Sequence, residues 1–490
     1  MTALSASTVS SLSLPTPTYD RAQARVGIVH FGLGNFHRSH QAMYLDRLMN
    51  TGSGLDWGIC GIGMKPGDRR KHQVLIDQDG LYTLVLRHPD GSLEGRVIGS
   101  VLEHRIAPDD PEAVYARLVD PAVRIVTLTV TEGGYLVDPA TRAFNAGDPS
   151  VVHDVADRSN PQTSFGYLIE ALRRRREAGI PPFTILSCDN LQGNGHYAHQ
   201  AVVEMARLID PDFAEWIDEN VAFPSSMVDR ITPVTTDDDR AAVTATFGIE
   251  DGWPVPAEPF TQWIVEDDFP MGRPPLEEVG VQFVEDVKPY ELMKLRLLNG
   301  SHQALAYLGA PLGYELVDEA MADKHIYRFL DQYMRREAVP TLPPLPGFDL
   351  DGYIQAALDR FSNPKMRDTI LRLAQDSSNR VAGFVLPTVR ANLEEGRRVP
   401  LGAAIVAAWS QYWQLIGKEL LPKSQVPEDV LAKEMTHAAM QWPERPLAFL
   451  EIEQIFGDLV SYDAFVHDYI AARTWLDELG VHETIDALLA

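Results

Sequence analysis

Four short, almost uninterrupted apolar runs in the first half of the chain predict buried β-strands. Such runs, rich in β-branched residues, are typical of parallel strands covered by helices on both faces. They span 26–33, 57–64, 124–131 and 183–189. Helical stretches at 41–49 and 164–178 alternate with them, the second flanked by Thr163 as N-cap and Gly179 as stop. This alternation predicts a doubly wound α/β domain of the Rossmann type. Residues 173–176, all arginine, are expected to form the solvated end of the second helix.

The second half of the chain lacks the strand pattern and carries apolar residues at helical spacing. These stretches span 290–308, 315–338, 351–361, 364–376, 383–395, 402–417, 447–456 and 462–474. The Ser/Thr/Pro-rich start has no basic region followed by an apolar one, so it indicates an arm and not a signal peptide. We therefore expect a flexible arm over 1–24, a Rossmann-type dinucleotide-binding domain over 25–285 and a mostly α-helical substrate-binding and catalytic domain over 286–490, with the active site between the two domains.

Composition narrows the class of protein. The chain has 490 residues, 45% hydrophobic and 23% charged, which is enough for a large core. Its net charge of −26 disfavours nucleic acid and anionic membranes as partners, and no apolar stretch approaches the ~20 residues of a membrane span. Cys60 and Cys188 show no CxxC or His/Cys spacing, so we expect no metal site, although one disulfide between them stays open. The expected setting is soluble and cytoplasmic.

The turn after the first predicted strand is the first candidate site. Gly32 and Gly34 precede Phe36, His37 and Arg38, and then a helix begins. Strand, glycine turn and helix open a dinucleotide-binding unit, in which the helix N–H groups face a pyrophosphate. His37 replaces the third glycine of the full fingerprint, so a purely structural glycine turn remains the alternative.

Polar residues follow the other predicted strands, at the edge where such sheets bind ligands. Asp68 is the candidate for the ribose hydroxyls, which favours NAD, but the neighbouring Arg69 and Arg70 leave NADP open. Glu132 and Asn190 follow the third and fourth strands and are candidates for cofactor contact and for a donor in the cleft. Each of these positions is also compatible with an ordinary solvated turn.

The segment 294–302, KLRLLNGSH, carries the candidate chemistry. Lys294 is one of only nine lysines against 34 arginines, and it stands within an apolar run. Burial disfavours a charged ammonium, so such a lysine can act as a base near neutral pH. At about 100° per residue, His302 lies about 80° from Lys294 around a helix, and Asn299 lies about 140° from it. The three side chains could therefore converge on one small substrate. A lysine that extends its ammonium to solvent from a core helix is the alternative.

Four motifs in order resemble the polyol-specific long-chain dehydrogenase/reductase family. They are IVHFGLGNFHRSHQA (28–42), SCDN (187–190), FPSSMVDRITP (223–233) and KLRLLNGSH (294–302). The resemblance implies metal-free hydride transfer between NAD(H) and a small-molecule polyol or ketose, with D-mannitol and D-fructose as the expected pair. Reduction of D-fructuronate to D-mannonate is the alternative. A monomer is implied. A nucleotide-binding sensor without catalysis would explain the glycine turn but not the remaining motifs.

The resemblance also implies a role for each matched residue. Lys294 would be the general base and acid, Asn190 and Asn299 would form an oxyanion hole, and His302 would orient the reacting hydroxyl. Asp229 and Arg372 would bind other hydroxyls of the sugar. Arg380 stands where family members usually have lysine, and it would bind a hydroxyl or, as a bidentate fork, a carboxylate.

Overall fold

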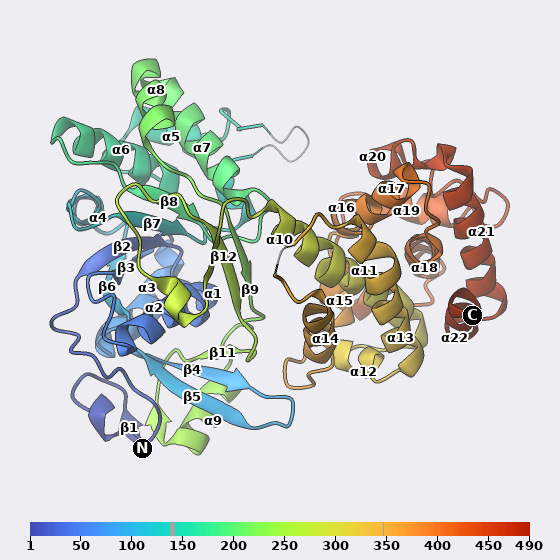
Figure 1. Ribbon diagram of the computed structural model, residues 1–490, viewed down its shortest axis with the longest axis horizontal. Helices are drawn as coiled ribbons and strands as arrows, with labels where there is room; N and C mark the ends of the chain where they lie inside the picture. Colours follow the sequence, from blue (N-terminus) through green and yellow to red (C-terminus); the bar gives the residue numbers. More distant parts are fainter. Residues whose placement is uncertain (138–142, 346) are drawn as a thin grey trace. The chain divides into compact units, whose positions relative to one another are not determined.

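The computed structural model describes residues 1–137, 143–345 and 347–490. The chain divides into two compact units, Met1–Lys288 and Pro289–Ala490, whose elements can be followed in Figure 1. The first unit contains all the strands that the structure describes, and the second is helical. This order confirms the predicted fold class of a Rossmann-type domain followed by a helical domain.

A five-stranded parallel sheet forms the centre of the first unit. Its strand order is β6-β3-β2-β7-β8, and every neighbouring pair is parallel. The strands are β2 (Val26–Phe31), β3 (Gly58–Gly63), β6 (Val101–Ile106), β7 (Ile125–Leu128) and β8 (Thr184–Ser187). The chain runs outward from β2 through β3 to β6 and then crosses to β7 on the other side of β2. This reversal is the switch point at which α/β sheets bind ligands, beyond the carboxyl ends of β2 and β7.

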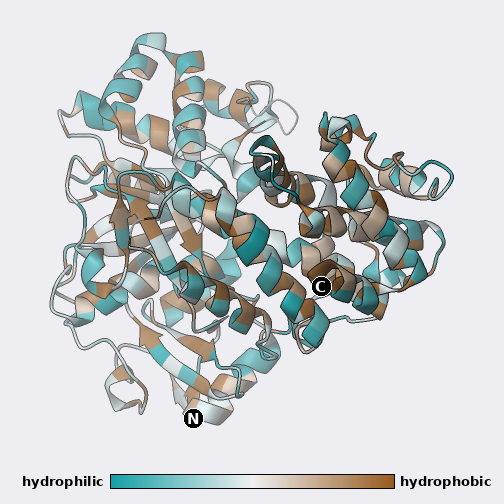
Figure 2. Cartoon of the chain, turned by 45° about the vertical axis from the view of Figure 1, so that its right-hand side comes forward, coloured by the Kyte–Doolittle hydropathy of each residue, from teal (hydrophilic) through white to brown (hydrophobic). Residues whose placement is uncertain are grey.

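Helices cover both faces of this sheet because successive strand residues point to opposite sides. Val29 belongs to one apolar core and the adjacent Ile28 to another. The first core includes α4 (Pro111–Leu118), α6 (Ser164–Glu177), α7 (Asn194–Ile209) and α8 (Pro211–Asn220). The second includes α2 (Gln41–Asn50) and α3 (Arg69–Asp77). Figure 2 colours the chain by hydropathy, and its helices carry both hydrophobic and hydrophilic residues.

Smaller sheets complete the first unit. They contain β4 (Tyr82–Arg87), β5 (Leu93–Ile98) and β11 (Val255–Ala257), then β9 (Ser226–Asp229), β12 (Gln262–Glu266) and β13 (Gln282–Val284), and the pair β1 (Thr2–Ala3) and β10 (Ile249–Glu250). The remaining helices are α1 (Asn35–Ser39), α5 (Pro149–Ala156) and α9 (Asp237–Phe247). The first residues therefore do not form the flexible arm expected from their composition. β1 pairs with β10, and Leu4 and Leu14 are buried in a small core.

Helix α6 has the predicted N-cap, but one of its four arginines is not solvated as predicted. The Thr163 side chain accepts a hydrogen bond from the N–H of Gly166, as an N-cap should. The expected solvated arginine run is wrong at Arg175, whose side chain is fully buried. Its guanidinium donates to the carbonyls of Pro181, Leu118 and Asp120, which compensate for its burial.

The second unit is a helical assembly around α18 (Pro400–Gly417). Trp409 and Trp413 on this helix are almost fully buried, as expected for a helix that is apolar all round. The other helices are α10 (Lys288–Met293), α11 (Gly300–Gly309), α12 (Val317–Met321), α13 (Lys324–Tyr333), α14 (Leu350–Phe361), α15 (Ile370–Ala374), α16 (Ser377–Phe384), α17 (Leu386–Glu394), α19 (Ala432–Ala439), α20 (Glu453–Phe456), α21 (Asp463–Glu478) and α22 (Val481–Leu489). Within the described ranges, no helix has both the length and the apolar character needed to cross a membrane.

Candidate active site

A π-helical turn carries the predicted catalytic lysine. Residues Lys294–Asn299 form this turn between α10 and α11, and the N–H of Gly300 donates to the carbonyl of Leu295, five residues back. A π-helix closes its hydrogen bonds between residues five apart, so Asn299 lies about one turn from Lys294, on nearly the same side. With α-helical geometry the two would lie about 140° apart. The α-helical angle between Lys294 and Asn299 that the sequence analysis assumed therefore does not apply. π-Helical turns are rare and often occur at functional sites.

Lys294 and Asn299 are both buried, with exposed fractions of 8% and 9%. Glu291, three residues before Lys294, is also buried, with 6% exposed. Positions three apart on a helix are neighbours, so the lysine has a carboxyl group on its own side of the helix. Sequence reasoning did not single out Glu291, although a carboxyl three residues from a candidate lysine base is visible in the sequence.

His302 and two arginines belong to one neighbourhood of the second unit. The His302 ring packs against Phe361, with centroids 4.5 Å apart. Arg372 forms an ion pair with Asp368. Burial opposes ionisation of Asp368, but the hydrogen bonds and charge of Arg372, with a smaller effect of His302, hold the pKa of Asp368 below its usual range. Asp368 is therefore the ion-pair partner of Arg372 and is close enough to feel the charge of His302, and it was not among the residues predicted from the sequence.

Arg380 has a structural contact in this neighbourhood. Its Nη1 donates to the carbonyl of Arg372 at 2.8 Å and to that of Leu373 at 3.2 Å, at the end of α15. Cations are favourable at the carboxyl end of a helix, where carbonyl groups lack partners within the helix. The arginine that departs from the family pattern thus helps to fix the segment that carries Arg372.

In the first unit the glycine turn has the geometry of a ligand-binding turn. Gly32 has φ +95°, and a Cβ there would lie 2.0 Å from the carbonyl oxygen of Thr129. At Gly34 the nearest atom to a Cβ, the Gly32 oxygen, is 3.7 Å away. Gly32 is therefore required by the fold, whereas Gly34 leaves open space beside the start of α1. The second glycine of a dinucleotide fingerprint provides such space for a pyrophosphate.

The side chains of His37 and Arg38, two of the predicted cofactor contacts, are buried. The His37 ring stacks on His30 with centroids 3.4 Å apart. Arg38 donates to the Trp253 carbonyl at 2.7 Å and to Asn35 Oδ1 at 2.8 Å, and burial lowers its pKa to about 10. Both side chains belong to the core behind the turn. Phe36 is partly buried and packs on the same core as α2.

A shared carboxylate organises the ends of β7 and β8. Asp189 accepts hydrogen bonds from the N–H groups of Val130 and Thr131, both at 2.9 Å, and from the Tyr135 hydroxyl at 2.7 Å. Thr131 has φ +68°, a strained value for a residue other than glycine. The neighbouring Glu132 and Asn190 are exposed at these strand ends. Sequence reasoning singled out these two residues but missed Asp189.

The other predicted residues of the first unit lie at strand ends or in turns. Asp229 ends β9 and is buried, paired in register with Gln262 of β12. Asp68 lies in a short 3-10 turn after β3 and accepts a hydrogen bond from the N–H of Lys65 at 3.1 Å. Arg69 forms an ion pair with Asp109, and Arg70 is exposed.

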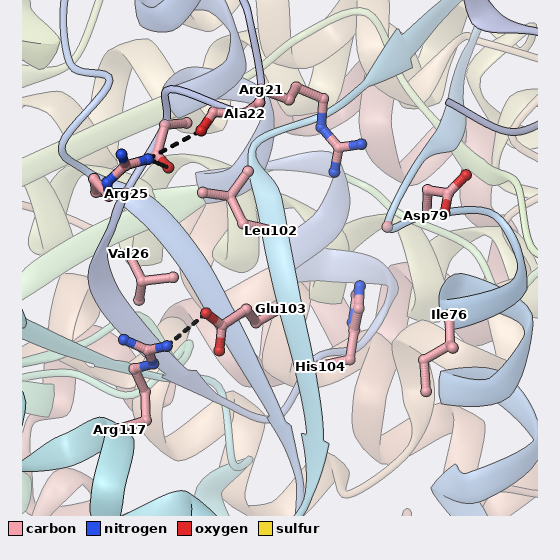
Figure 3. A pocket seen from close by; sticks show the side chains of 12 residues that line it. Arg21, Ala22, Arg25, Val26, Ile76, Asp79, Leu102, Glu103, His104 and Arg117 are labelled. Carbon is pink, nitrogen blue, oxygen red and sulfur yellow. Dashed lines mark hydrogen bonds and ion pairs between the residues drawn. The ribbon is translucent and has the colours of Figure 1, made fainter. Parts of the chain in front are cut away.

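A cavity of about 680 Å³ is lined by none of these residues, and Figure 3 shows side chains that line it. It is lined by β6 and by the segment before β2, including Arg25, Val26, Glu103 and His104. Val26 starts β2, whereas the glycine turn follows the other end of that strand. None of the predicted site residues lines this cavity, so we do not assign it to the cofactor.

Comparisons with known proteins match both units. Residues 26–278 match the family described as the mannitol dehydrogenase Rossmann domain, and residues 286–475 match the mannitol dehydrogenase C-terminal domain. The chain is 42% identical over 468 residues to a mannitol 2-dehydrogenase of Cereibacter sphaeroides, covering 95% of this chain and 97% of that protein. A mannitol dehydrogenase of Saccharomyces cerevisiae is 43% identical over 460 residues, covering 93% of this chain and 91% of that protein.

Two solved structures share the whole fold. One is the mannitol 2-dehydrogenase of Pseudomonas fluorescens in a ternary complex with NAD and D-mannitol, at 41% identity, a TM-score of 0.83 and 99% coverage of both chains. The other is a D-sorbitol dehydrogenase in its substrate-free form, at 37% identity, a TM-score of 0.90 and coverage of 98% of this chain and 100% of that one. On the family matches and these relatives, the chain belongs to the mannitol dehydrogenase family of NAD-dependent oxidoreductases.

Proposed function

We propose that this protein interconverts D-mannitol and D-fructose with NAD(H), and that Lys294 is its general base and acid. The observation that supports the lysine is its burial on a π-helical turn that puts Asn299 on nearly the same side. The relatives named mannitol 2-dehydrogenase, and the relative solved with NAD and D-mannitol, support the substrate pair.

In the proposed oxidation, the Nζ atom of Lys294 takes the hydroxyl proton of the substrate. Asn299 and Asn190 donate hydrogen bonds to the oxygen as negative charge develops on it. One such donor can lower a barrier by roughly 3–4 kcal/mol, and a positioned base contributes about 10²–10⁴-fold. A bound nicotinamide supplies the hydride acceptor, so the protein contributes alignment and proton transfer.

The remaining residues are proposed to hold the sugar and the cofactor. His302 orients the reacting hydroxyl, and Asp229 and Arg372 bind other hydroxyls. For Arg380 we propose a positioning role through α15, because its guanidinium donates to the carbonyls there.

For the cofactor we propose that Gly34 gives the pyrophosphate its room. Phe36, Asp68 and Glu132 are the side chains proposed to lie near it. The carboxylate of Asp68 favours NAD over NADP because a 2′-phosphate would be repelled.

Substrate identity is tested by initial rates of NADH oxidation with D-fructose and with D-fructuronate in parallel, each repeated with NADPH. We expect D-fructose with NADH to dominate. Oxidation of D-mannitol and D-sorbitol with NAD completes the test, because a D-sorbitol dehydrogenase shares this fold at a TM-score of 0.90. No turnover of D-fructose with either cofactor would overturn the proposal, and dominant turnover of D-fructuronate would transfer it to a uronate reductase.

A further inference from the structure

A second cluster of chemically competent side chains lies in the helical unit, apart from the proposed catalytic residues. Asp323 and His325 stand at the beginning of α13, and His482 and Asp486 belong to α22, the last helix. His482 and Asp323 are separated by 159 residues in the sequence. This separation explains why ligand spacing along the chain predicts no metal site here.

Asp323, His325 and His482 lie together, and Asp486 lies on the other side of the His325 ring. His482 Nε2 lies 2.6 Å from Asp323 Oδ2, and His325 Nδ1 lies 3.3 Å from Asp323 Oδ1. His325 Nε2 lies 3.4 Å from Asp486 Oδ2, and the two imidazoles stack with centroids 4.6 Å apart. One ligand atom from each of Asp323, His325 and His482 lies within 4.8 Å of the other two.

We propose that Asp323, His325 and His482 form a binding site for a divalent transition metal of the zinc class. Zinc binds imidazole nitrogen at about 2.0–2.1 Å and carboxylate oxygen at about 2.0–2.2 Å, so neighbouring ligands in a tetrahedron lie roughly 3.4 Å apart. His325 Nδ1 lies 3.3 Å from Asp323 Oδ1, close to this value, whereas His482 Nε2 lies 2.6 Å from Asp323 Oδ2, a hydrogen-bond distance that would have to lengthen when an ion binds. Two imidazoles select zinc-like ions over calcium and magnesium, which prefer oxygen ligands.

The surroundings fit such a site. The Tyr314 hydroxyl donates to Asp323 Oδ2 at 3.1 Å, which orients the carboxylate as outer partners of metal ligands do. A water molecule would provide the fourth ligand. Asp486 faces His325 Nε2, the ring nitrogen away from Asp323, and pairs with Arg328 at 3.6 Å. All three proposed protein ligands are partly exposed, so an ion can enter from solvent.

The bound ion would fasten α22 to the start of α13 and would play no part in hydride transfer. The site is therefore independent of the proposed function, and its test needs no substrate. Among the residues that the structure describes, this is the one group of three or more His, Cys, Asp or Glu side chains with metal-binding spacing. The predicted stoichiometry is one ion per chain.

The first measurement is calorimetric titration of the chelator-treated, dialysed protein with ZnCl₂, and separately with CaCl₂. We expect one equivalent of Zn²⁺ and no uptake of Ca²⁺. In His325→Asn and His482→Asn the Zn²⁺ affinity should fall by more than the 10- to 100-fold that loss of an outer partner costs. His199→Asn is the matched control, because His199 Nε2 lies 2.6 Å from Asp218 Oδ1 in a similar pair without a third ligand.

A second measurement avoids the variants. The melting temperature of the wild-type protein should rise with Zn²⁺ and return to its starting value with excess chelator, because an ion that binds only the folded state stabilises it. The proposal is overturned if the wild-type protein takes up no stoichiometric Zn²⁺. It is equally overturned if both His325→Asn and His482→Asn bind Zn²⁺ as the wild type does, or if His199→Asn loses the same affinity.

Discussion

The two glycines of the turn after β2 should respond to alanine in opposite ways. At Gly32 a methyl group would lie 2.0 Å from the Thr129 carbonyl oxygen, at a φ of +95°. The left-handed backbone alone costs an alanine about 1–2 kcal/mol. Relief of the overlap also requires β2 and β7 to separate where Phe31 pairs with Leu128. We expect Gly32→Ala to lower the free energy of unfolding by about 3 kcal/mol or more.

At Gly34 the backbone has φ −100°, and the nearest atom to a new methyl is 3.7 Å away. Gly34→Ala should therefore keep the stability or raise it by about 0.5 kcal/mol, through the entropy of the unfolded chain. The methyl would occupy the space proposed for the pyrophosphate, so NADH affinity should fall at least about tenfold, which is ~1.4 kcal/mol.

Urea unfolding followed by circular dichroism measures the first quantity, and titration of NADH by its fluorescence measures the second. Each variant serves as the control for the other, since both replace a glycine in the same turn. A Gly34→Ala protein that binds NADH as the wild type does would refute the assignment of this turn to the cofactor. A Gly32→Ala protein of wild-type stability would refute the argument from backbone strain.

Three further predictions concern buried ionisable groups. Lys294→Met should lower kcat by about 10²–10⁴-fold and leave NADH affinity unchanged; turnover within tenfold of the wild type would remove Lys294 from catalysis. Asp189→Asn weakens three accepted hydrogen bonds, so the melting temperature should fall and the KM for NADH should rise. An unchanged KM would show that this carboxylate does not support cofactor binding. Burial raises the pKa of Glu337 from 4.5 to about 7, against hydrogen bonds from the N–H groups of Leu401 and Gly402. The folded state then holds an extra proton between these pH values, so the free energy of unfolding falls as pH rises through them, by on the order of 3 kcal/mol in total. Urea titrations between about pH 5 and pH 8 should show this slope in the wild type and a flatter one in Glu337→Gln.

The elements that sequence reasoning placed correctly are those set by local patterns. Uninterrupted apolar runs give β2 and β3 because strands buried on both faces need apolar residues at every position. Thr163 was identifiable as an N-cap because a cap depends on a residue type at one position. The doubly wound fold class follows from the alternation of strands and helices, whereas the strand order that places the switch point at β2 and β7 is seen only in the structure.

The features that were missed depend on contacts distant in sequence or on backbone geometry. Arg38 donates to a carbonyl 215 residues away, and nothing near Arg38 in the sequence indicates that its charge is buried. The π-helical turn at Lys294–Asn299 changes which residues share a side, but its apolar pattern is also compatible with an α-helix. The 364–376 stretch was expected to be helical, yet only Ile370–Ala374 is, after Arg367 adopts φ +51°.

The single carboxylate of Asp189 has a consequence for protein engineering. Because it accepts hydrogen bonds from Val130, Thr131 and Tyr135, the loop after β7 cannot be exchanged with that of a relative as an independent cassette. A grafted loop that lacks the Tyr135 hydroxyl, or that places the N–H groups of positions 130 and 131 differently, would leave the buried acid short of donors. Mutant libraries aimed at this edge of the sheet should therefore vary positions 130–135 and 187–190 together. Chimeras that take these two segments from different parents should yield folded protein less often than chimeras that take both from one parent.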